Sequence, residues 1–260
     1  MSKGFFTDTT VCIGCKACEI ACKQWNQLPD DGMFFSGMSY DNSVDLGGST
    51  WRHVEFIERP VPLGGQEAGN FSWLFLSDVC THCRRAGCLE ACPTGAIVRT
   101  EFDTVYVQPD VCNGCGYCVV SCPFGVIDRL EDDGRAWKCT LCYDRLKDNL
   151  EPACAKACPT DSILFGEIEE LHEKAEARVA ELHRRGMAEA YLYGVDQAGT
   201  EGLNAFFLLV DEPEVYNLPP DPVAPLKKAG QSWTALLAAS LGLLAAAIGA
   251  VVSVRNGRPS

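Results

Sequence analysis

The sequence lacks the features that mark several common classes of protein. It contains no recognisable nucleophile–base motif, no phosphate-binding loop and no dinucleotide-binding fingerprint. We therefore expect no catalytic site and no bound organic substrate. Positive charge is also scarce: 22 Lys and Arg residues stand against 35 Asp and Glu residues, a net charge of −13. Because such a protein repels backbone phosphates, we expect no binding to nucleic acid.

An apolar segment is also missing before the first cysteine. The opening MSKGFFTDTTVC has no hydrophobic core of a secretory signal, so we expect no cleavable signal. Disulfide scaffolds are usually short and exported unfolded, which disfavours disulfides in this chain of 260 residues. We therefore interpret its sixteen cysteines as metal-bound thiolates.

The cysteines form four quartets without remainder. The first and third have the spacing C-x2-C-x2-C-x3-C, the second has C-x2-C-x4-C-x3-C, and eleven residues separate the second and third cysteines of the fourth. The quartets are Cys12, Cys15, Cys18 and Cys22; Cys80, Cys83, Cys88 and Cys92; Cys112, Cys115, Cys118 and Cys122; and Cys139, Cys142, Cys154 and Cys158. Proline follows the last cysteine in three of them, at Pro93, Pro123 and Pro159.

This spacing is the bacterial ferredoxin signature for 4Fe–4S clusters. Three thiolates on a tight loop can bind three corners of a cluster, and we expect the fourth to lie in a helix that directs it to a neighbouring cluster. Gly14, Gly114 and Gly116 would let backbone N–H groups approach the sulfurs. The alternative of a different class is a zinc-stabilised interaction module, because zinc ribbons use two C-x-x-C pairs per ion. Four complete quartets favour iron and sulfur, hence four 4Fe–4S clusters.

The lengths between the quartets indicate how they pair. Only 19 residues (93–111) part the second and third quartets, whereas 57 residues (23–79) part the first and second. We therefore hypothesise that the inner two quartets form one two-cluster module and the outer two form the other. With fourth cysteines exchanged within each pair, the predicted ligand sets are Cys12, Cys15, Cys18 and Cys158; Cys22, Cys139, Cys142 and Cys154; Cys80, Cys83, Cys88 and Cys122; and Cys92, Cys112, Cys115 and Cys118.

The expected fold class is α+β, with two bacterial-ferredoxin-like modules in residues 1–165 and an insertion at 23–79. Short β-hairpins are predicted after Pro93 and Pro123, with turns near Asp103 and at Asp133-Gly134. Further strands are predicted at 52–58, 72–77 and 204–210. Residues 166–216 should form a docking segment, because Ile168, Leu171, Ala175, Val179 and Leu182 have the spacing of an apolar helix stripe.

A Pro-rich linker (217–231) leads to a predicted transmembrane helix (232–254) and a short tail (255–260). The 23 uncharged residues would form a helix of about 35 Å, enough for a hydrocarbon core of about 30 Å. Small residues recur every fourth position, so we expect a membrane partner to pack on Ala238, Gly242, Ala246 and Ala250. Two basic residues on each side leave the orientation open: Lys227 and Lys228 before the span, Arg255 and Arg258 after it.

Three residues inside or beside the quartets have open roles. Lys16 and Lys138 each neighbour a cysteine, and a cation there would favour the reduced, more negative cluster. A solvated surface lysine is the alternative, and both interpretations stay open. His82 lies inside a quartet that is already complete, so we interpret it as a spacer rather than a ligand.

Taken in order, these segments resemble a known family. The segments on which the resemblance depends are GCKACEIACKQWN, CPTGAIV, NGCGYCVVSCPFGV and KCTLCYDRLKDNLEPACAKACPTDSILFG, together with EKAEARVAELHRRG and VYNLPPDP. They resemble the four-cluster ferredoxin subunits of molybdopterin oxidoreductases and, more closely, the β (iron–sulfur) subunit of membrane-bound formate dehydrogenase. The likeness covers nearly the whole sequence and is weakest in residues 30–70. Lys23 stands where the generic ferredoxin pattern has proline.

The resemblance implies an electron-transfer subunit without a catalytic site of its own. It would take electrons from a catalytic subunit with a molybdenum or tungsten pterin centre and pass them to a membrane cytochrome b that reduces quinone. The family's cysteine pairing is the nested one. The resemblance also implies a single-pass protein of the cytoplasmic membrane with its soluble part on the outer, periplasmic face, although the sequence permits the opposite side. The alternative is the iron–sulfur subunit of a polysulfide, dimethyl sulfoxide or nitrate reductase, in which electrons run the other way.

Overall fold

A computed structural model gives the fold and describes residues 2–32, 37, 40, 41, 43, 45–59 and 72–256. The protein divides into two compact units, Met1–Ala224 and Pro225–Ser260. The strands are β1 (Lys3–Asp8), β2 (Arg52–Arg59), β3 (Ser72–Val79), β4 (Ile97–Arg99), β5 (Val105–Val107), β6 (Asp128–Arg129), β7 (Ala136–Trp137), β8 (Ile163–Glu167), β9 (Tyr191–Tyr193) and β10 (Ala205–Leu209). The α-helices are α1 (Ala17–Trp25), α2 (Gly87–Glu90), α3 (Tyr117–Val120), α4 (Tyr143–Lys147), α5 (Ala153–Lys156), α6 (Ile168–Arg184) and α7 (Ala229–Asn256). Three 3-10 turns are η1 (Thr9–Val11), η2 (Pro213–Tyr216) and η3 (Pro225–Lys228).

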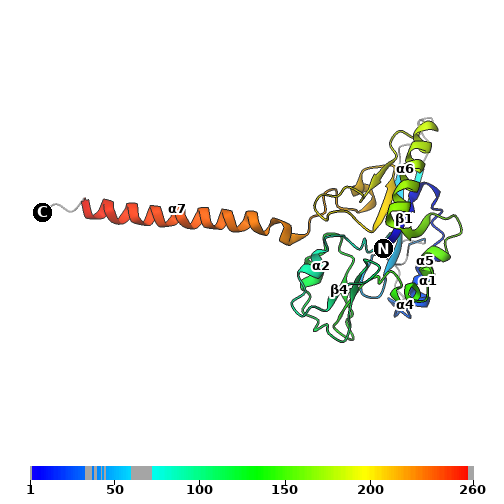
Figure 1. The fold of residues 1–260 in the computed structure, drawn as a ribbon, viewed down its shortest axis with the longest axis horizontal. Helices are drawn as coiled ribbons and strands as arrows, with labels where there is room; N and C mark the ends of the chain where they lie inside the picture. Colours follow the sequence, from blue (N-terminus) through cyan, green and yellow to red (C-terminus); the bar gives the residue numbers. More distant parts are fainter. Residues whose placement is uncertain are drawn as a thin grey trace. The chain divides into compact units, whose positions relative to one another are not determined.

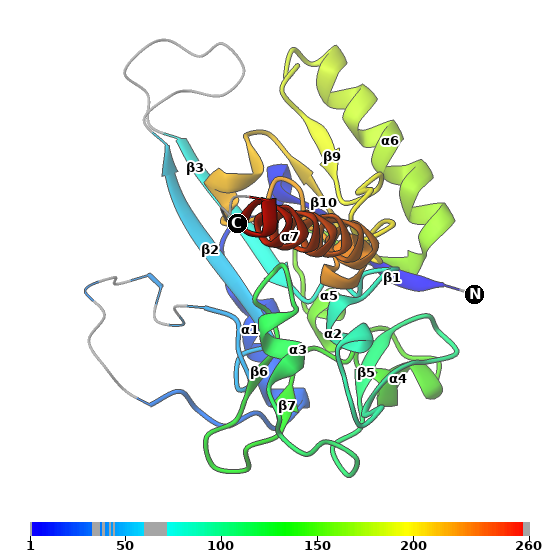
Figure 2. The ribbon, with the colours of Figure 1, turned by 90° about the vertical axis from the view of Figure 1, so that its left-hand side faces the viewer.

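The first unit is organised by a four-stranded sheet with the order β8-β1-β10-β9. Figure 1 labels its strand β1, and Figure 2 labels β1, β10 and β9. The N-terminal strand β1 pairs in parallel with β10 and antiparallel with β8. β10 is buried along its whole length, as its sequence AFFLL requires of a central strand. Because β1 lies between strands from far along the sequence, the sheet holds the first quartet beside the fourth.

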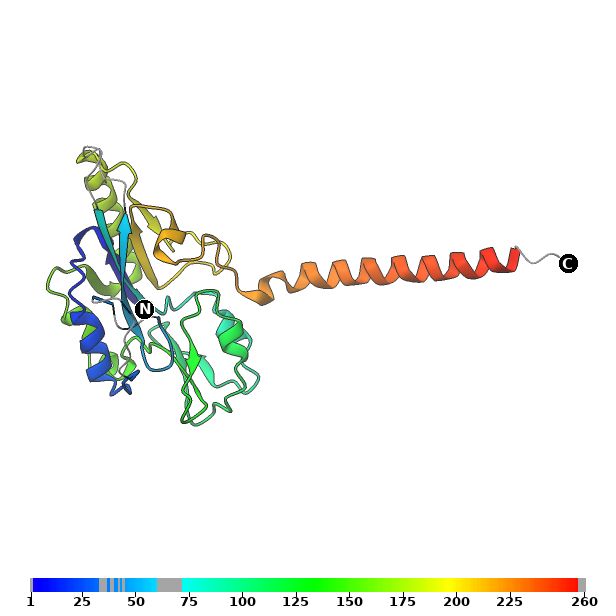
Figure 3. The ribbon, with the colours of Figure 1, turned by 180° about the vertical axis from the view of Figure 1, so that it is seen from behind.

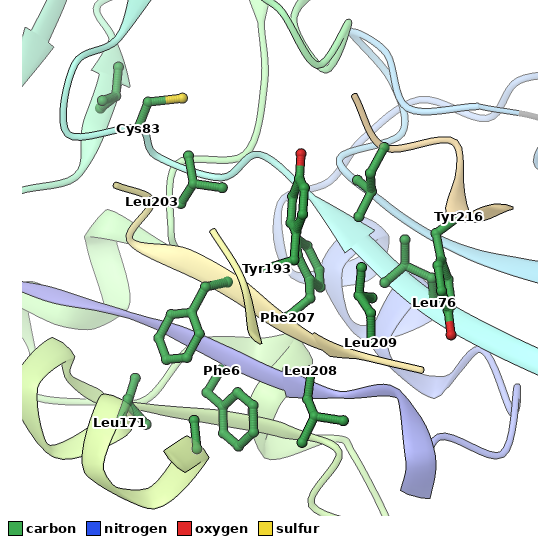
Figure 4. Close-up of a cluster of buried hydrophobic side chains, with 14 of the residues drawn as sticks. Phe6, Leu76, Cys83, Leu171, Tyr193, Leu203, Phe207, Leu208, Leu209 and Tyr216 are labelled. Atoms are coloured by element: carbon green, nitrogen blue, oxygen red, sulfur yellow. The ribbon is translucent and has the colours of Figure 1, made fainter. Parts of the chain in front are cut away.

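Helix α6 covers one face of this sheet. Its apolar stripe buries Leu171, Ala175 and Leu182, which join the main hydrophobic core. In Figure 4 Leu171, Phe6 and Leu208 lie on one side of the strands, and Tyr193, Phe207 and Leu209 lie on the other. This separation follows from the two-residue period of a strand. The helix expected from the apolar stripe is present as α6, and the strand predicted at 204–210 is present as β10. The docking role predicted for 166–216 stays a prediction.

The insertion after the first quartet supplies a long antiparallel hairpin. β2 and β3 pair over eight residues each, from Arg52 opposite Val79 to Arg59 opposite Ser72. The strands predicted at 52–58 and 72–77 are thus confirmed. The connecting residues 60–71 lie outside the described residues, as do several positions between 33 and 44.

Two small hairpins follow the second and third quartets, as predicted. β4 pairs with β5 and β6 with β7. Asp103 and Gly134 adopt positive φ in the two turns, 63° and 70°. In Figure 3 the segment of these hairpins, in green, lies below the blue and yellow strands of the central sheet.

The position of the fourth cysteines differs from the expectation. Of the four, only Cys22 lies within a helix, α1. Cys92, Cys122 and Cys158 each come two residues after the end of the single-turn helices α2, α3 and α5, which instead hold the third cysteine of their quartets. A one-turn helix ends before the fourth thiol is reached, so this thiol is presented by the loop that follows.

The second unit contains α7, a helix of 28 residues. Within the described residues this segment is the one helix long and apolar enough to cross a membrane. It includes the span predicted at 232–254, whereas residues 257–260 of the predicted tail lie outside the described residues. The boundaries predicted at 165, 216 and 231 stay predictions.

The central sheet leaves no room for a side chain at Gly4. A Cβ built there would lie 1.7 Å from the backbone oxygen of Asn204, which accepts a hydrogen bond from the Phe5 N–H at 2.8 Å. We predict that Gly4→Ala separates β1 from β10 and destabilises the first unit by about 1–3 kcal/mol or more. Gly166→Ala is the matched control, because its Cβ would lie 3.7 Å from the Leu171 side chain, an ordinary contact. Thermal unfolding of the two purified variants measures the difference, and equal transitions would contradict the prediction.

Candidate metal centres

Three internal cavities are each lined by four thiols. In every case three cysteines are contributed by one quartet and one by another. We name each cavity after its first cysteine: the Cys12 cavity is lined by Cys12, Cys15, Cys18 and Cys158; the Cys80 cavity by Cys80, Cys83, Cys88 and Cys122; and the Cys92 cavity by Cys92, Cys112, Cys115 and Cys118. These groupings are the same as three of the sets expected from the sequence.

The remaining four thiols form a buried group, which we call the Cys22 group. It consists of Cys22, Cys139, Cys142 and Cys154, which are 3–6% exposed. Burial raises the pKa of the Cys22 thiol well above its usual value, and negative charge on Cys139, Cys154 and Cys142 raises it further. These four sulfurs are therefore close enough to interact strongly.

The thiols meet backbone and side-chain donors. The Leu141 N–H donates to Cys139 Sγ at 3.3 Å, and the Ala136 N–H donates to Cys112 Sγ at 3.5 Å. Asn26 Nδ2 donates to Cys22 Sγ at 3.6 Å. Gly114, with φ 72°, packs its Cα so closely that a Cβ would lie 2.4 Å from the Gly134 oxygen. N–H groups directed at sulfur stabilise a bound thiolate, so the loops are built for ligand sulfurs.

The donor chemistry fits an iron–sulfur cluster. Burial raises the pKa of Cys18 and Cys142 to about 11 and of Cys83 to about 12. These thiols need a strong Lewis acid to be ionised near neutral pH, and thiolates are the ligands that iron–sulfur clusters take. Among the described residues, no three Cys, His, Asp or Glu side chains are arranged to hold a single metal ion. The four-thiol cavities instead suit a group that spans several sulfurs.

Lys138 is a buried cation between two groups of thiols. Its side chain is 2% exposed, and Nζ donates to the backbone oxygens of Val105 at 2.5 Å and Cys139 at 2.9 Å. Burial alone would lower the pKa of Lys138, but the sulfurs of Cys80, Cys88 and Cys139 offset this and raise it. The interpretation of Lys138 as a solvated surface lysine is therefore wrong.

Lys16 has a different environment. Its ammonium lies 2.8 Å from an Asp41 carboxylate oxygen and 3.4 Å from one of Glu19, and its side chain is 20% exposed. These two carboxylates oppose its charge at the neighbouring thiols. His82 is buried in the lining of the Cys80 cavity, and its Nδ1 accepts a hydrogen bond from the Val105 N–H at 3.1 Å.

Two polar residues that sequence reasoning missed lie beside the first quartet. Ser77 Oγ is 3.2 Å from Cys18 Sγ, and Arg52 Nη1 donates to the same Ser77 Oγ at 3.0 Å. The alternation of inward and outward positions along β2 could have indicated Arg52 in part, because an arginine at an inward position of a paired strand needs a buried partner.

Only Cys15 and Cys115 are exposed among the sixteen cysteines. Exposed apolar side chains are close in sequence to each of them. They are Ile13 and Ile20 near Cys15, and Val111, Tyr117 and Val120 near Cys115. The protein thus brings one thiol of the Cys12 cavity and one of the Cys92 cavity to the surface, in apolar surroundings.

Known families and proteins match most of the sequence. Two families described as 4Fe-4S dicluster domains match residues 11–96 and 71–168. The formate dehydrogenase iron-sulfur subunit of Haemophilus influenzae is 43% identical over 219 residues, which cover 83% of this chain and 68% of that protein. The iron-sulfur subunit of the nitrate-inducible formate dehydrogenase of Escherichia coli is 42% identical, covering 83% and 71%. The B subunit of the anaerobic dimethyl sulfoxide reductase of Escherichia coli is 35% identical, covering 66% and 76%.

Replacing Lys138 by methionine tests the role of its charge. If the thiols of the Cys80 cavity hold a cluster, we predict that Lys138→Met lowers its reduction potential by about 59 mV, a tenfold change in the ratio of reduced to oxidised cluster. Lys16→Met is the matched control and should change the potentials less, because Asp41 and Glu19 already oppose that charge. A potentiometric titration followed by electron paramagnetic resonance (EPR) measures both. Equal shifts in the two variants would contradict the prediction.

Proposed function

The protein belongs to the family of formate dehydrogenase iron–sulfur subunits, and from this membership we propose how it conducts electrons. It is the electron-transfer subunit of a formate dehydrogenase complex and binds several 4Fe–4S clusters. We propose that it binds four, and that it relays electrons from a catalytic subunit with a molybdenum or tungsten pterin centre to a membrane cytochrome b that reduces quinone. The observation that carries this proposal is the grouping of thiols from different quartets around common cavities.

The proposed ligand sets follow the cavities. Cluster 1 is assigned to the Cys12 cavity, cluster 2 to the Cys22 group, cluster 3 to the Cys80 cavity and cluster 4 to the Cys92 cavity. The support is strongest for clusters 1, 3 and 4, because a cavity lies between their thiols. For cluster 2 the support is the burial of all four thiols. Burial raises the pKa of Cys22, Cys139 and Cys142, and the sulfur of Cys154 adds to the rise in each.

The protein's own residues supply the ligands of the clusters, the hydrogen-bond donors to their sulfurs and the buried surroundings. When bound, each 4Fe–4S cluster accepts or releases one electron. The sixteen thiolates hold the irons, and N–H donors such as those of Leu141 and Ala136 stabilise the sulfur charge. Burial of the Cys22 group and of the Cys80 cavity excludes water, which lowers the dielectric around the clusters and strengthens every charge nearby.

Contacts between the groups support a row in the order 1, 2, 3, 4. Burial raises the pKa of Cys18, and the sulfur of Cys154 adds to the rise, so the Cys12 cavity neighbours the Cys22 group. Burial also raises the pKa of Cys139, and the sulfur of Cys80 adds to it, which links the Cys22 group to the Cys80 cavity. Helices α2 and α3, which carry thiols of the last two cavities, contact each other. The exposed thiols Cys15 and Cys115 then belong to the two ends, where partner subunits can approach.

The C-terminal helix supports the membrane part of the proposal. Ala238, Gly242, Ala246 and Ala250 form one small-residue face of α7, on which we propose that the cytochrome b subunit packs. We further propose a single-pass protein of the cytoplasmic membrane with its soluble part on the outer, periplasmic face. The lower identity to the dimethyl sulfoxide reductase subunit, 35% against 43%, favours formate as the electron source.

The exchange of fourth cysteines predicts which variants share a phenotype. Cys158→Ser and Cys15→Ser should perturb the same EPR signal, because both residues line the Cys12 cavity. Cys22→Ser is the matched control, since Cys22 is in the same quartet as Cys15 but in a different set, and it should perturb another signal. Iron analysis of the wild type should give about sixteen iron atoms per protein molecule. Different signals perturbed by Cys158→Ser and Cys15→Ser would contradict the proposed sets, and zinc in place of iron would refute the proposed function.

The helix face predicts which substitution disconnects the membrane partner. Ala246→Leu should leave formate-dependent reduction of a soluble dye intact but decrease formate-dependent quinone reduction by about tenfold or more, because leucine prevents close helix approach. Ala247→Leu is the same change about 100° further round the helix and should have little effect. Both rates are measured on the purified complex in detergent or liposomes. A wild-type complex that does not reduce the dye with formate would refute the assignment to formate.

A further inference from the structure

Arg52 is a fully buried arginine whose guanidinium is only partly hydrogen-bonded. It is 1% exposed and opens strand β2. Nη1 donates to Ser77 O at 3.2 Å and to Ser77 Oγ at 3.0 Å, and the guanidinium carbon lies 4.8 Å from the centre of the Phe5 ring. An arginine in such a place carries a permanent positive charge, since its guanidinium does not lose its proton in proteins.

The other donors of Arg52 lack partners. Within the described part of the protein, Nε and Nη2 are buried without a hydrogen-bond acceptor, and no carboxylate there forms an ion pair with the guanidinium. A buried charge without a counter-charge is strongly unfavourable, so something with negative charge is expected beside it. Burial alone would lower the pKa of Arg52, but the sulfurs of Cys154, Cys18, Cys139 and Cys22 offset this and raise it. The sulfurs therefore compensate Arg52 together with the buried carboxyl of Asp78, whose pKa burial raises and the charge of Arg52 lowers in part.

These sulfurs belong to two different sets. Cys18 lines the Cys12 cavity, whereas Cys22, Cys139 and Cys154 belong to the Cys22 group. Arg52 and Cys22 also line one pocket, and Phe5, whose ring lies against the guanidinium, shares one cluster of buried residues with Cys18, Cys22, Cys139 and Cys154. Arg52 is therefore near the thiols of both proposed clusters 1 and 2. Lys138, by contrast, interacts with Cys80, Cys88 and Cys139, between clusters 2 and 3.

Ser77 connects Arg52 to Cys18 through a short series of polar atoms. Its Oγ accepts the hydrogen bond from Arg52 Nη1, so the hydroxyl hydrogen is free for another acceptor. Cys18 Sγ lies 3.2 Å from this oxygen and is placed to accept it. A hydroxyl polarised by a cation is a stronger donor, so the charge of Arg52 reaches Cys18 through Ser77.

We propose that Arg52 sets the reduction potentials of clusters 1 and 2 together, through its buried charge near the Cys22 group and through Ser77 at Cys18. The inference rests on the proposed function, because it requires clusters in both sets. A fixed positive charge in a low-dielectric interior stabilises the reduced, more negative cluster and so raises its potential. One side chain of the insertion hairpin would thereby keep two neighbouring sites easy to reduce.

A potentiometric titration of the purified complex, followed by EPR, tests the inference. The signals of clusters 1 and 2 are first identified as those lost in Cys158→Ser and Cys154→Ser. In Arg52→Gln we expect the ratio of reduced to oxidised cluster at a fixed potential to fall about tenfold for both signals, a shift of about 59 mV per electron. The signals of clusters 3 and 4 should shift much less than those of clusters 1 and 2. Arg52→Lys, which keeps the charge, should shift the first two signals less than Arg52→Gln does.

Two further variants separate this role from a purely structural one. Ser77→Ala leaves the charge in place and removes one hydroxyl, so it should lower the potential of cluster 1 and not that of cluster 2. Ser77→Ala therefore tests the effect on cluster 1 through Cys18 even if the complex with Arg52→Gln does not assemble. Arg184→Gln removes one exposed positive charge from α6 and should change no potential. A structural role for Arg52 predicts lower thermal stability with unchanged potentials.

The outcomes distinguish the inference from the function on which it rests. A wild-type complex without reducible EPR signals would refute the proposed function itself. Four reducible signals in the wild type, with potentials of clusters 1 and 2 unchanged in Arg52→Gln and in Ser77→Ala, would overturn the role of Arg52 and leave the proposed function standing. The expected pattern is a joint fall in Arg52→Gln and a fall of cluster 1 alone in Ser77→Ala.

Discussion

The structure depends on keeping negative sulfur charge inside a protein whose own net charge is −13. Burial opposes thiolate formation, as the raised pKa values of Cys18, Cys83 and Cys142 indicate. Such groups are ionised only where metal, N–H donors and cations act on them together. The cavities, the tight loops beside the quartets and the buried cations Arg52 and Lys138 all serve this one requirement.

The same requirement explains why distant parts of the sequence pair. Strand β1, just before the first quartet, is hydrogen-bonded on one side to β8, just after the fourth quartet, and on the other to β10. This pairing brings Cys158 to the cavity lined by Cys12, Cys15 and Cys18. A thiol set built from distant segments cannot form before these strands pair, so binding of the metal and folding of the sheet stabilise each other.

Short-range patterns were sufficient to predict most elements of the fold. The hairpins after Pro93 and Pro123, the strands of the insertion and helix α6 all follow from turn residues and apolar periodicity within about twenty residues. The strand order β8-β1-β10-β9 could not be predicted, because it depends on contacts between segments far apart in the sequence. The burial of Lys138 could not be predicted either, because the local sequence Lys-Cys is compatible with an exposed and with a buried lysine. The role of Arg52 could not be predicted, because its partners are far from it in sequence and become its neighbours only in the folded protein.

The insertion hairpin links the two modules physically as well as in sequence. Val54 and Val79 of β2 and β3 share one hydrophobic cluster with Phe5 of the central sheet and with thiols of the first, second and fourth quartets. β3 ends one residue before Cys80, so the hairpin fixes where the second quartet begins relative to the first. Two separate ferredoxin modules would each have an apolar interior, and solvent would separate their surfaces. By packing there, β2 and β3 extend the apolar interior from Cys18 to Cys80, and a low dielectric in this interior strengthens the effect of nearby charges on the thiols.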